Sequence, residues 1–296
     1  MGLRQAAGRF RARHAWAIHR LKGVPLPATY VDVHVVEHCN LNCRGCAHFS
    51  PVAEPCFLDP ADFERSLIAL APLFDTSFSS LHLLGGEPLL HPQLSELMRL
   101  ARRHLPQAEL QVITNGTLIP RMGEDFWAAC RETRAVVYVS EYPVDMDYKA
   151  VLALLTQHGV EHRFDPRSDF ICHVFDPRGT QDPHESWRRC QFGGTCVQLV
   201  GTRLYACPRC AYADHVNRAF GESLRHERGD WLELSDATPL RLYRFLDTPK
   251  PFCRYCDLSA EHTAPWAVSR RERSEWFGTG EQPDACSAAC GERTVR

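Results

Sequence analysis

Residues 31–46 read VDVHVVEHCNLNCRGC, an apolar β-branched run followed directly by three cysteines within eight positions. The run predicts a buried strand, so the cysteines lie on the loop that leaves its carboxyl end. A structural zinc site closes with four ligands, whereas three thiolates on a 4Fe–4S cluster leave one iron free to bind another molecule. The spacing of Cys39, Cys43 and Cys46 therefore predicts an open metal centre.

Strand-like and helix-like segments alternate after this loop. Strands are predicted at 80–88, 109–116, 135–141 and 160–165, and helices from residue 60 and at 92–105, 124–132 and 148–159. This repetition predicts a parallel sheet with right-handed crossovers. A closed eight-unit barrel takes about 250 residues, more than the alternation covers. We therefore expect an α/β fold, a partial (β/α)6-type TIM barrel over residues 30–185, with its ligands at the carboxyl ends of the strands.

Three further segments flank this predicted barrel. Residues 1–29 hold six Lys or Arg and no acid, which predicts a basic helix that is either a solvated face or a contact for an anionic partner. Residues 186–260 are rich in cysteine and predict a small domain with a β-hairpin turning at Gly201, then a helix. Residues 261–296 are polar and predict an irregular segment with a flexible end.

Bulk composition limits the classes of function. The formal net charge of −2 gives no drive toward nucleic acid, and no apolar stretch is long enough to span a bilayer. Arginines run through the start of the chain, where a secretory signal needs an apolar core, so we expect a cytoplasmic protein. In that reducing compartment the 14 cysteines are metal-binding or catalytic thiols rather than disulfides.

A second motif, Gly85–Gly86–Glu87–Pro88, ends the second predicted strand. Together with the three-cysteine loop it resembles the radical S-adenosylmethionine (radical SAM) superfamily. The resemblance implies a 4Fe–4S cluster on Cys39, Cys43 and Cys46 that cleaves SAM reductively and yields a hydrogen-abstracting 5′-deoxyadenosyl radical. Gly45 occupies a position that is often aromatic in that family, so His48 or Phe49 is expected to hold the adenine. The resemblance also implies SAM contacts from Gly85, Gly86, Glu87, Pro88, Thr114, Asn115 and Ser140.

The later cysteines allow two groupings. Cys207, Cys210, Cys253 and Cys256 form a C-x2-C pair of pairs, a zinc-ribbon pattern. The set Cys190, Cys207, Cys253 and Cys256 instead resembles the twitch module of radical SAM enzymes, which implies an auxiliary 4Fe–4S cluster. Whether Cys196 or Cys210 takes the place of Cys190 stays open.

The cluster layout is similar to that of 2-deoxy-scyllo-inosamine dehydrogenases and neomycin C epimerases. It implies hydrogen abstraction from a sugar or aminocyclitol carbon, a small-molecule carbohydrate substrate, and a flavodoxin- or ferredoxin-type reductant. Oxidation of the alcohol needs a base, for which the candidates are Asp165, Arg167 and His173. Epimerisation needs a hydrogen donor, for which the spare cysteines are Cys56, Cys172, Cys196 and Cys210.

Two other functions remain open at this stage. A radical SAM maturase of a ribosomal peptide often has an N-terminal peptide-binding domain, and here only residues 1–29 precede the first predicted strand. A non-catalytic iron–sulfur or zinc protein would not need the GGEP motif beside the cysteine loop.

Overall fold

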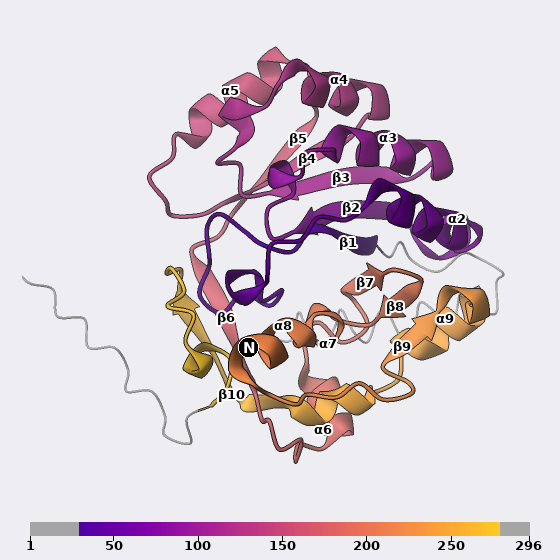
Figure 1. Cartoon of the computed structure of the whole chain (residues 1–296), viewed down its shortest axis with the longest axis vertical. Helices are drawn as coiled ribbons and strands as arrows, with labels where there is room; N and C mark the ends of the chain where they lie inside the picture. The colour runs from indigo at the N-terminus through magenta and orange to yellow at the C-terminus, as the bar shows by residue number, and fades with distance from the viewer. Residues whose placement is uncertain (1–29, 279–296) are drawn as a thin grey trace, which may run out of the picture.

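A mixed α/β architecture surrounds one eight-stranded sheet in the computed structural model, which describes residues 30–278. The sheet order is β5-β4-β3-β2-β1-β7-β8-β9, and its strands from β5 to β7 are parallel (Figure 1). These parallel strands are β1 (Tyr30–Val36), β2 (Ser80–Gly85), β3 (Glu109–Thr114), β4 (Val136–Glu141), β5 (His162–Pro166) and β7 (Val197–Val200). The predicted α/β class with a partial TIM-type sheet is confirmed. The basic helix predicted at 1–29 and the end of the C-terminal segment lie outside the described residues.

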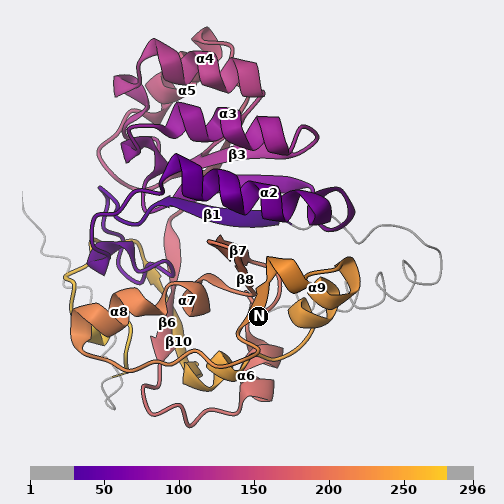
Figure 2. The same cartoon turned by 45° about the vertical axis from the view of Figure 1, so that its right-hand side comes forward.

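Helices connect the first five strands, as the alternation predicts. They are α2 (Pro60–Ser77), α3 (Leu94–His104), α4 (Glu124–Thr133) and α5 (Tyr148–Gln157), of which α2, α3 and α4 lie side by side along the sheet (Figures 1 and 2). Asp59 begins α2 by accepting hydrogen bonds from the backbone N–H groups of Ala61 (2.8 Å) and Asp62 (3.3 Å), and Pro60 suits the first helical position. Buried Leu67 and Leu70 then face the core.

Strand β1 has one apolar and one polar face. Val31, Val33 and Val35 belong to the main apolar core, because alternate residues of a strand point to opposite sides. On the other face Asp32 accepts hydrogen bonds from Gln198 on β7 (2.8 Å) and pairs with His82 Nδ1 on β2 (2.9 Å). This buried network ties β7 to β1, so the sheet continues past its first strand.

The sixth parallel strand is therefore β7 beside β1, and the strand that follows β5 leaves the sheet. β6 (Asp169–Phe175) pairs antiparallel with β10 (Cys256–Pro265). The prediction of an irregular segment from residue 261 was therefore wrong at its start, because β10 continues to Pro265. Most β10 residues are partly or fully exposed, so the strand has no apolar alternation by which the sequence could reveal it.

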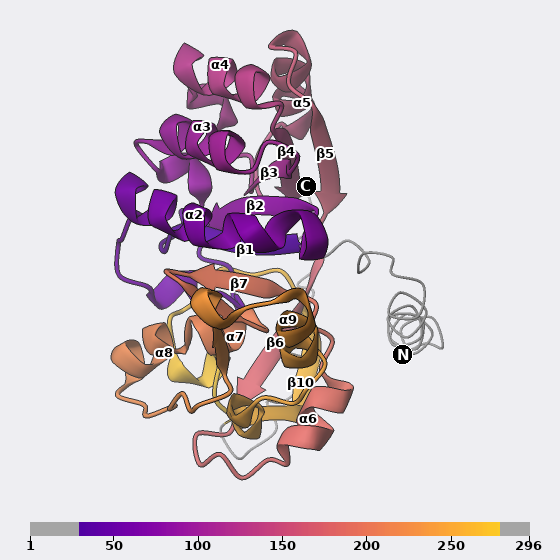
Figure 3. The ribbon, with the colours of Figure 1, turned by 90° about the vertical axis from the view of Figure 1, so that its right-hand side faces the viewer.

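The residues that follow β6 pack below β1, as Figure 3 shows. The predicted hairpin is confirmed: β7 and β8 (Arg203–Tyr205) are joined at Gly201, whose φ of 57° is a conformation that glycine adopts readily. β9 (Trp231–Glu233) follows at the sheet edge, and the helices are α6 (Pro183–Arg189), α7 (Pro208–Ala211), α8 (Ala213–Phe220) and α9 (Pro239–Leu246). No helix among residues 30–278 has the length and apolarity needed to cross a membrane.

Short 3-10 helices complete the chain at Ser50–Val52, Pro88–Leu90, Ile119–Arg121, Leu234–Asp236, Pro251–Tyr255 and Arg273–Glu275. A second aromatic core lies under the cysteine loop and includes Phe49, Phe175, Phe252, Trp276 and Phe277. It joins the cysteine loop to the last described residues.

Candidate functional site

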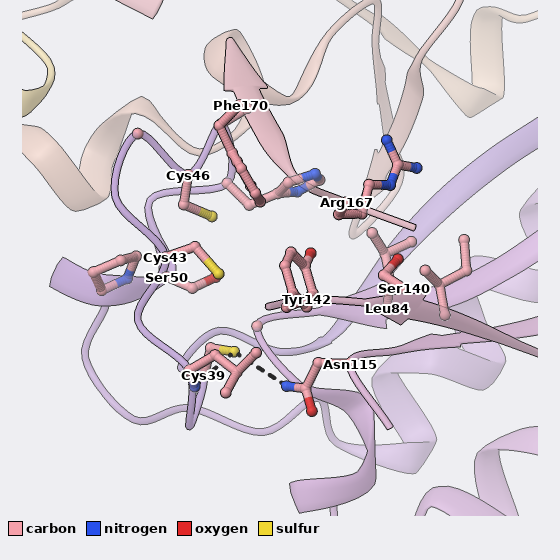
Figure 4. A pocket seen from close by; sticks show the side chains of 18 of the residues that line it. Cys39, Cys43, Cys46, Ser50, Leu84, Asn115, Ser140, Tyr142, Arg167 and Phe170 are labelled. Carbon is pink, nitrogen blue, oxygen red and sulfur yellow. Dashed lines mark hydrogen bonds between the residues drawn. The ribbon is translucent and has the colours of Figure 1, made fainter. Parts of the chain in front are cut away.

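A cavity of about 430 Å³ opens at the carboxyl ends of the parallel strands. Figure 4 shows the three cysteines of the loop on one side of it, with Ser140 and Arg167 on the other. Its lining includes nine of the residues predicted for the cluster and for SAM, namely Cys39, Cys43, Cys46, His48, Gly85, Gly86, Thr114, Asn115 and Ser140. Pockets of about 300–1,000 Å³ suit small ligands, so the cavity and its three thiols fit an open cluster with a bound cofactor.

Hydrogen bonds from distant segments hold the cysteine loop. Asn115 Nδ2 lies 3.8 Å from Cys39 Sγ, and Trp266 Nε1 donates to Cys43 Sγ at 3.2 Å. Trp276 Nε1 donates to the Cys46 carbonyl oxygen at 3.2 Å. Sequence reasoning missed both tryptophan contacts, because residues more than 200 positions apart carry no local pattern that links them.

The segment 266–269 also straps the loop through its backbone. The N–H of Arg44 donates to the Ala267 carbonyl (2.8 Å), and the N–H of Ser269 donates to the Asn42 carbonyl (2.8 Å). Cys43 and Val268 form an isolated antiparallel bridge. The polypeptide that follows β10 therefore fixes the conformation of the three-cysteine loop.

Burial makes the free thiols weak acids. It raises the pKa of Cys39 and of Cys43 to about 12 and also raises the pKa of Cys46. Thiolates form in such a place when a metal ion takes up the charge. Among residues 30–278 no three His, Cys, Asp or Glu side chains are arranged as ligands of one ion; the three thiols instead face a shared cavity.

Glu87 lies behind the cavity wall rather than in it. Its carboxylate is fully buried and accepts hydrogen bonds from Thr114 Oγ1 (2.6 Å), Asn115 N (2.9 Å) and Leu89 N (3.0 Å). Burial raises its pKa to about 7, against the hydrogen bonds, which lower it. Glu87 thus fixes the end of β3, where two of the predicted SAM contacts lie, and Pro88 follows it outside the lining residues.

The two glycines permit a close approach of backbones. Gly85 has a φ of 138°, a region open to glycine. A Cβ on Gly86 would lie 2.7 Å from the Cys39 nitrogen and closer still to the His38 carbonyl oxygen. The end of β2 therefore packs directly against the start of the cysteine loop. The two glycines are needed for this backbone contact as well as for access of a ligand.

Of the two residues predicted to hold adenine, only His48 lines the cavity. Its Nδ1 lies 2.6 Å from Nε2 of His34, and His34 Nδ1 pairs with Glu37 at 2.9 Å. Burial, then the neighbouring His34, lower the pKa of His48 to about 3, so the ring is neutral. Phe49 is buried in the aromatic core against Phe175.

The far side of the cavity holds two of the three candidate bases. Arg167 and His173 line it, whereas Asp165 lies outside the lining and pairs with Arg167 at 2.5 Å. His173 Nδ1 bonds Glu261 Oε2 at 2.7 Å. Burial lowers the pKa of His173 although Glu261 opposes the shift, so the imidazole is neutral and its Nε2 remains available for a proton.

The four candidate hydrogen donors lie elsewhere. Cys56 is exposed, Cys172 is buried on β6 next to Gly45, and Cys196 accepts a hydrogen bond from the Tyr30 hydroxyl at 3.1 Å. Cys210 lines a second cavity. None of the four lines the first cavity, whose wall includes Cys39, Cys43 and Cys46.

Five cysteines meet at that second cavity, of about 20 Å³. They comprise the four of the twitch grouping and one more: Cys190, Cys207, Cys210, Cys253 and Cys256. Burial raises the pKa of Cys253 to about 12 and of Cys256 to about 11. Four or five cysteines around one cavity match the all-cysteine ligation of a 4Fe–4S cluster. Phe192 lines this cavity and the first one as well.

Comparison with known proteins agrees with this geometry. Residues 33–162 match the family model of the radical SAM superfamily. The chain therefore carries a radical SAM domain, and that family implies a 4Fe–4S cluster and SAM binding. The prediction of the superfamily from the cysteine loop and GGEP is confirmed.

Individual relatives cover different parts of the chain. The GTP 3′,8-cyclase of Sulfurovum sp. (strain NBC37-1) is 26% identical over 95 residues, 32% of this chain and 29% of the relative. The GTP 3′,8-cyclase of Microcystis aeruginosa (strain NIES-843 / IAM M-2473) is 30% identical over 104 residues, 34% of this chain and 31% of the relative. The match thus spans less than a third of these proteins' length. The solved structure of BtrN in complex with AdoMet and 2-DOIA aligns over 85% of this chain and 99% of its own, with 15% identity and a TM-score of 0.51, so the two share the fold.

Proposed function

We propose that this radical SAM protein oxidises a hydroxyl-bearing carbon of a sugar or aminocyclitol, with a second iron–sulfur cluster as its electron acceptor. The observation that carries the proposal is the shared wall between the two cysteine-lined cavities, where Phe192 contributes to both. An alcohol oxidation removes a hydrogen atom, a proton and an electron. A one-electron acceptor directly beside the reaction cavity meets the third requirement.

When bound, the first cluster and SAM supply a radical that abstracts hydrogen from an unactivated carbon. Cys39, Cys43 and Cys46 are the proposed ligands of that cluster. Asn115 and Trp266 orient two of these thiolates by their N–H groups. A flavodoxin- or ferredoxin-type protein is the proposed reductant.

His173 is the proposed base. Its ring is neutral, it lines the cavity, and its Nδ1 is fixed by Glu261, so Nε2 can accept the hydroxyl proton. Arg167 and the faces of Tyr142 and Phe170, which stack with centroids 5.6 Å apart, supply polar and apolar contacts suited to a hydroxylated ring. Epimerisation is the second candidate, and oxidation is placed first because none of the four spare cysteines lines this cavity.

Metal analysis tests the cofactor content. We expect about eight irons in the anaerobically reconstituted wild type and about four when Cys39, Cys43 and Cys46 are all replaced by Ala. One zinc and no iron in the triple variant would contradict the auxiliary cluster. A panel of sugars and aminocyclitols deuterated at their carbinol carbons then tests the reaction.

Oxidation predicts deuterium in 5′-deoxyadenosine together with a stoichiometric carbonyl product. His173→Gln should still cleave SAM but should form less carbonyl product. Deuterium transfer without a carbonyl, and with solvent hydrogen at the inverted carbon, would establish epimerisation instead. Turnover of a peptide with none of these compounds would contradict the proposed substrate class.

A further inference from the structure

Two buried cations face the cavity that five cysteines line. Arg209 is 2% exposed and Lys250 is 3% exposed, and both side chains line this cavity. Burial of a full charge is costly unless an opposite charge or a set of hydrogen bonds compensates it. The surroundings of the two side chains therefore indicate what occupies the cavity between them.

The Arg209 guanidinium lacks partners for most of its donors. One terminal nitrogen, Nη2, donates to the Val174 carbonyl at 3.0 Å, and the guanidinium lies 4.4 Å from the centre of the Phe175 ring. The other two nitrogens, Nε and Nη1, are buried and have no hydrogen-bond partner among residues 30–278. Buried guanidinium groups are normally paired with acceptors, so Arg209 is set to meet an anion.

Lys250 is held in place by neutral groups. Its ammonium donates to the carbonyl oxygens of Phe245 and of Thr248, the latter at 2.7 Å, and lies 5.0 Å from the centre of the Trp187 ring. The nearby buried carboxylate of Asp230 lies outside the cavity lining and accepts hydrogen bonds from two backbone N–H groups at 2.7 Å each. The positive charge of Lys250 thus remains directed at the cysteines.

The charges match the occupant that the proposed function requires. An oxidised 4Fe–4S core with four thiolates carries two negative unit charges, and one-electron reduction adds a third. We propose that Arg209 and Lys250 are the counter-ions of the auxiliary cluster and hold its reduction potential high enough to accept an electron. This inference rests on the proposed function, which supplies the cluster. In a low-dielectric site a nearby cation stabilises the reduced, more negative form most, and the free N–H groups of Arg209 can donate to sulfur.

Reductive titration of the auxiliary cluster alone tests the assignment. The background is the full chain with Cys39, Cys43 and Cys46 replaced by Ala, reduced stepwise under argon and followed by absorbance and electron paramagnetic resonance. Arg209→Met should shift the reduction equilibrium at least tenfold toward the oxidised form, which is about 59 mV for a one-electron couple. Arg209→Lys, which keeps the charge, should recover part of the shift. Arg228→Met, at an exposed position, should leave the potential unchanged.

Thermal stability gives a second readout, because the same substitution should change Tm in opposite directions in the iron-free and the iron-loaded chain. In the iron-free chain Arg209→Met should raise Tm, because it removes a buried charge whose Nε and Nη1 have no hydrogen-bond partner. In the iron-loaded chain the same substitution should lower Tm and speed the loss of iron to a chelator. A substitution that merely damages the fold would lower Tm in both the iron-free and the iron-loaded chain.

The outcomes separate two kinds of failure. Full iron content with a potential unchanged in Arg209→Met would overturn the counter-ion assignment and leave the proposed function standing. A triple-Ala background that binds zinc in place of iron would overturn the auxiliary cluster, and the proposed oxidation with it. A tenfold or larger shift that Arg209→Lys partly reverses is the result we expect.

Discussion

Substitution of Gly86 by Ala tests whether the end of β2 must touch the cysteine loop. An ideal Cβ at this position would lie 2.7 Å from the Cys39 nitrogen, and real Cβ atoms rarely approach other atoms within 3.0 Å. The atoms in the way are backbone, so a side-chain rotation cannot relieve the overlap. The cysteine loop has to move away from β2.

Two hydrogen bonds join the segments that must separate. Gly86 N donates to the Val36 carbonyl at 2.7 Å, and Glu87 N donates to the His38 carbonyl at 3.1 Å. Overpacking typically costs about 1–3 kcal/mol, and each weakened hydrogen bond adds about 0.5–1.5 kcal/mol. The expected loss of unfolding free energy is therefore about 2–6 kcal/mol, which lowers Tm by at least about 4 °C at this chain length.

Calorimetry on the iron-free chain and iron analysis after reconstitution measure the two consequences. We expect Gly86→Ala to lose most of the iron held by the first cluster, because Cys39 is displaced, and to keep the iron of the auxiliary site. Gly123→Ala is the matched control: nothing lies within 4 Å of a Cβ there and its φ is −84°, so the change should stay below about 1 kcal/mol. A Gly86→Ala protein with wild-type Tm and full iron would refute the reasoning.

Three further substitutions address other parts of the structure. Glu87→Gln turns an amide NH2 toward a backbone N–H donor. Urea unfolding should therefore show a loss of about 1–3 kcal/mol in the free energy of unfolding. An unchanged urea midpoint would contradict this. Trp266→Phe removes the donor to Cys43 Sγ and should lower the potential of the first cluster, which a reductive titration will detect. Burial raises the pKa of Asp176, but its hydrogen bonds, including one from Arg178, outweigh burial and hold that pKa below its ordinary range. The stability lost in Asp176→Asn should thus be constant above about pH 4 and shrink as the pH falls through the folded pKa.

Local patterns were sufficient to predict most of the residues that meet at the first cavity. The three-cysteine loop, Gly85–Gly86 and Thr114–Asn115 each follow a strand that reads as apolar and β-branched. Because parallel strands end at one edge of a sheet, residues that directly follow them must meet. The sequence did not decide which of the later cysteines form one site, and the structure explains why. Cys207 and Cys210 are three residues apart at the start of α7, so both reach the same cavity.

Long-range pairing is what the sequence could not reveal. The contact between Trp266 and Cys43 joins positions 223 residues apart, and β10 pairs with β6 without an apolar face of its own. Arg209 reads as an ordinary residue between two cysteines, and only its burial without partners distinguishes it. These features depend on how separate elements pack, which local propensity and periodicity do not encode.

The strap at 266–269 connects the three-cysteine loop with the second cysteine-lined cavity. Cys39, Cys43 and Cys46 belong to a loop whose backbone and thiol partners come from residues that follow β10. β10 in turn forms through pairing with β6 and begins at Cys256, one of the five thiols of the second cavity. Order at the second site therefore fixes the polypeptide that orders the first. A cluster at the cysteines of the later segment would stabilise the strap, because metal binding to a folded site adds its binding energy to folding. The two cavities are thus linked structurally by β10 and by Phe192, which lines both.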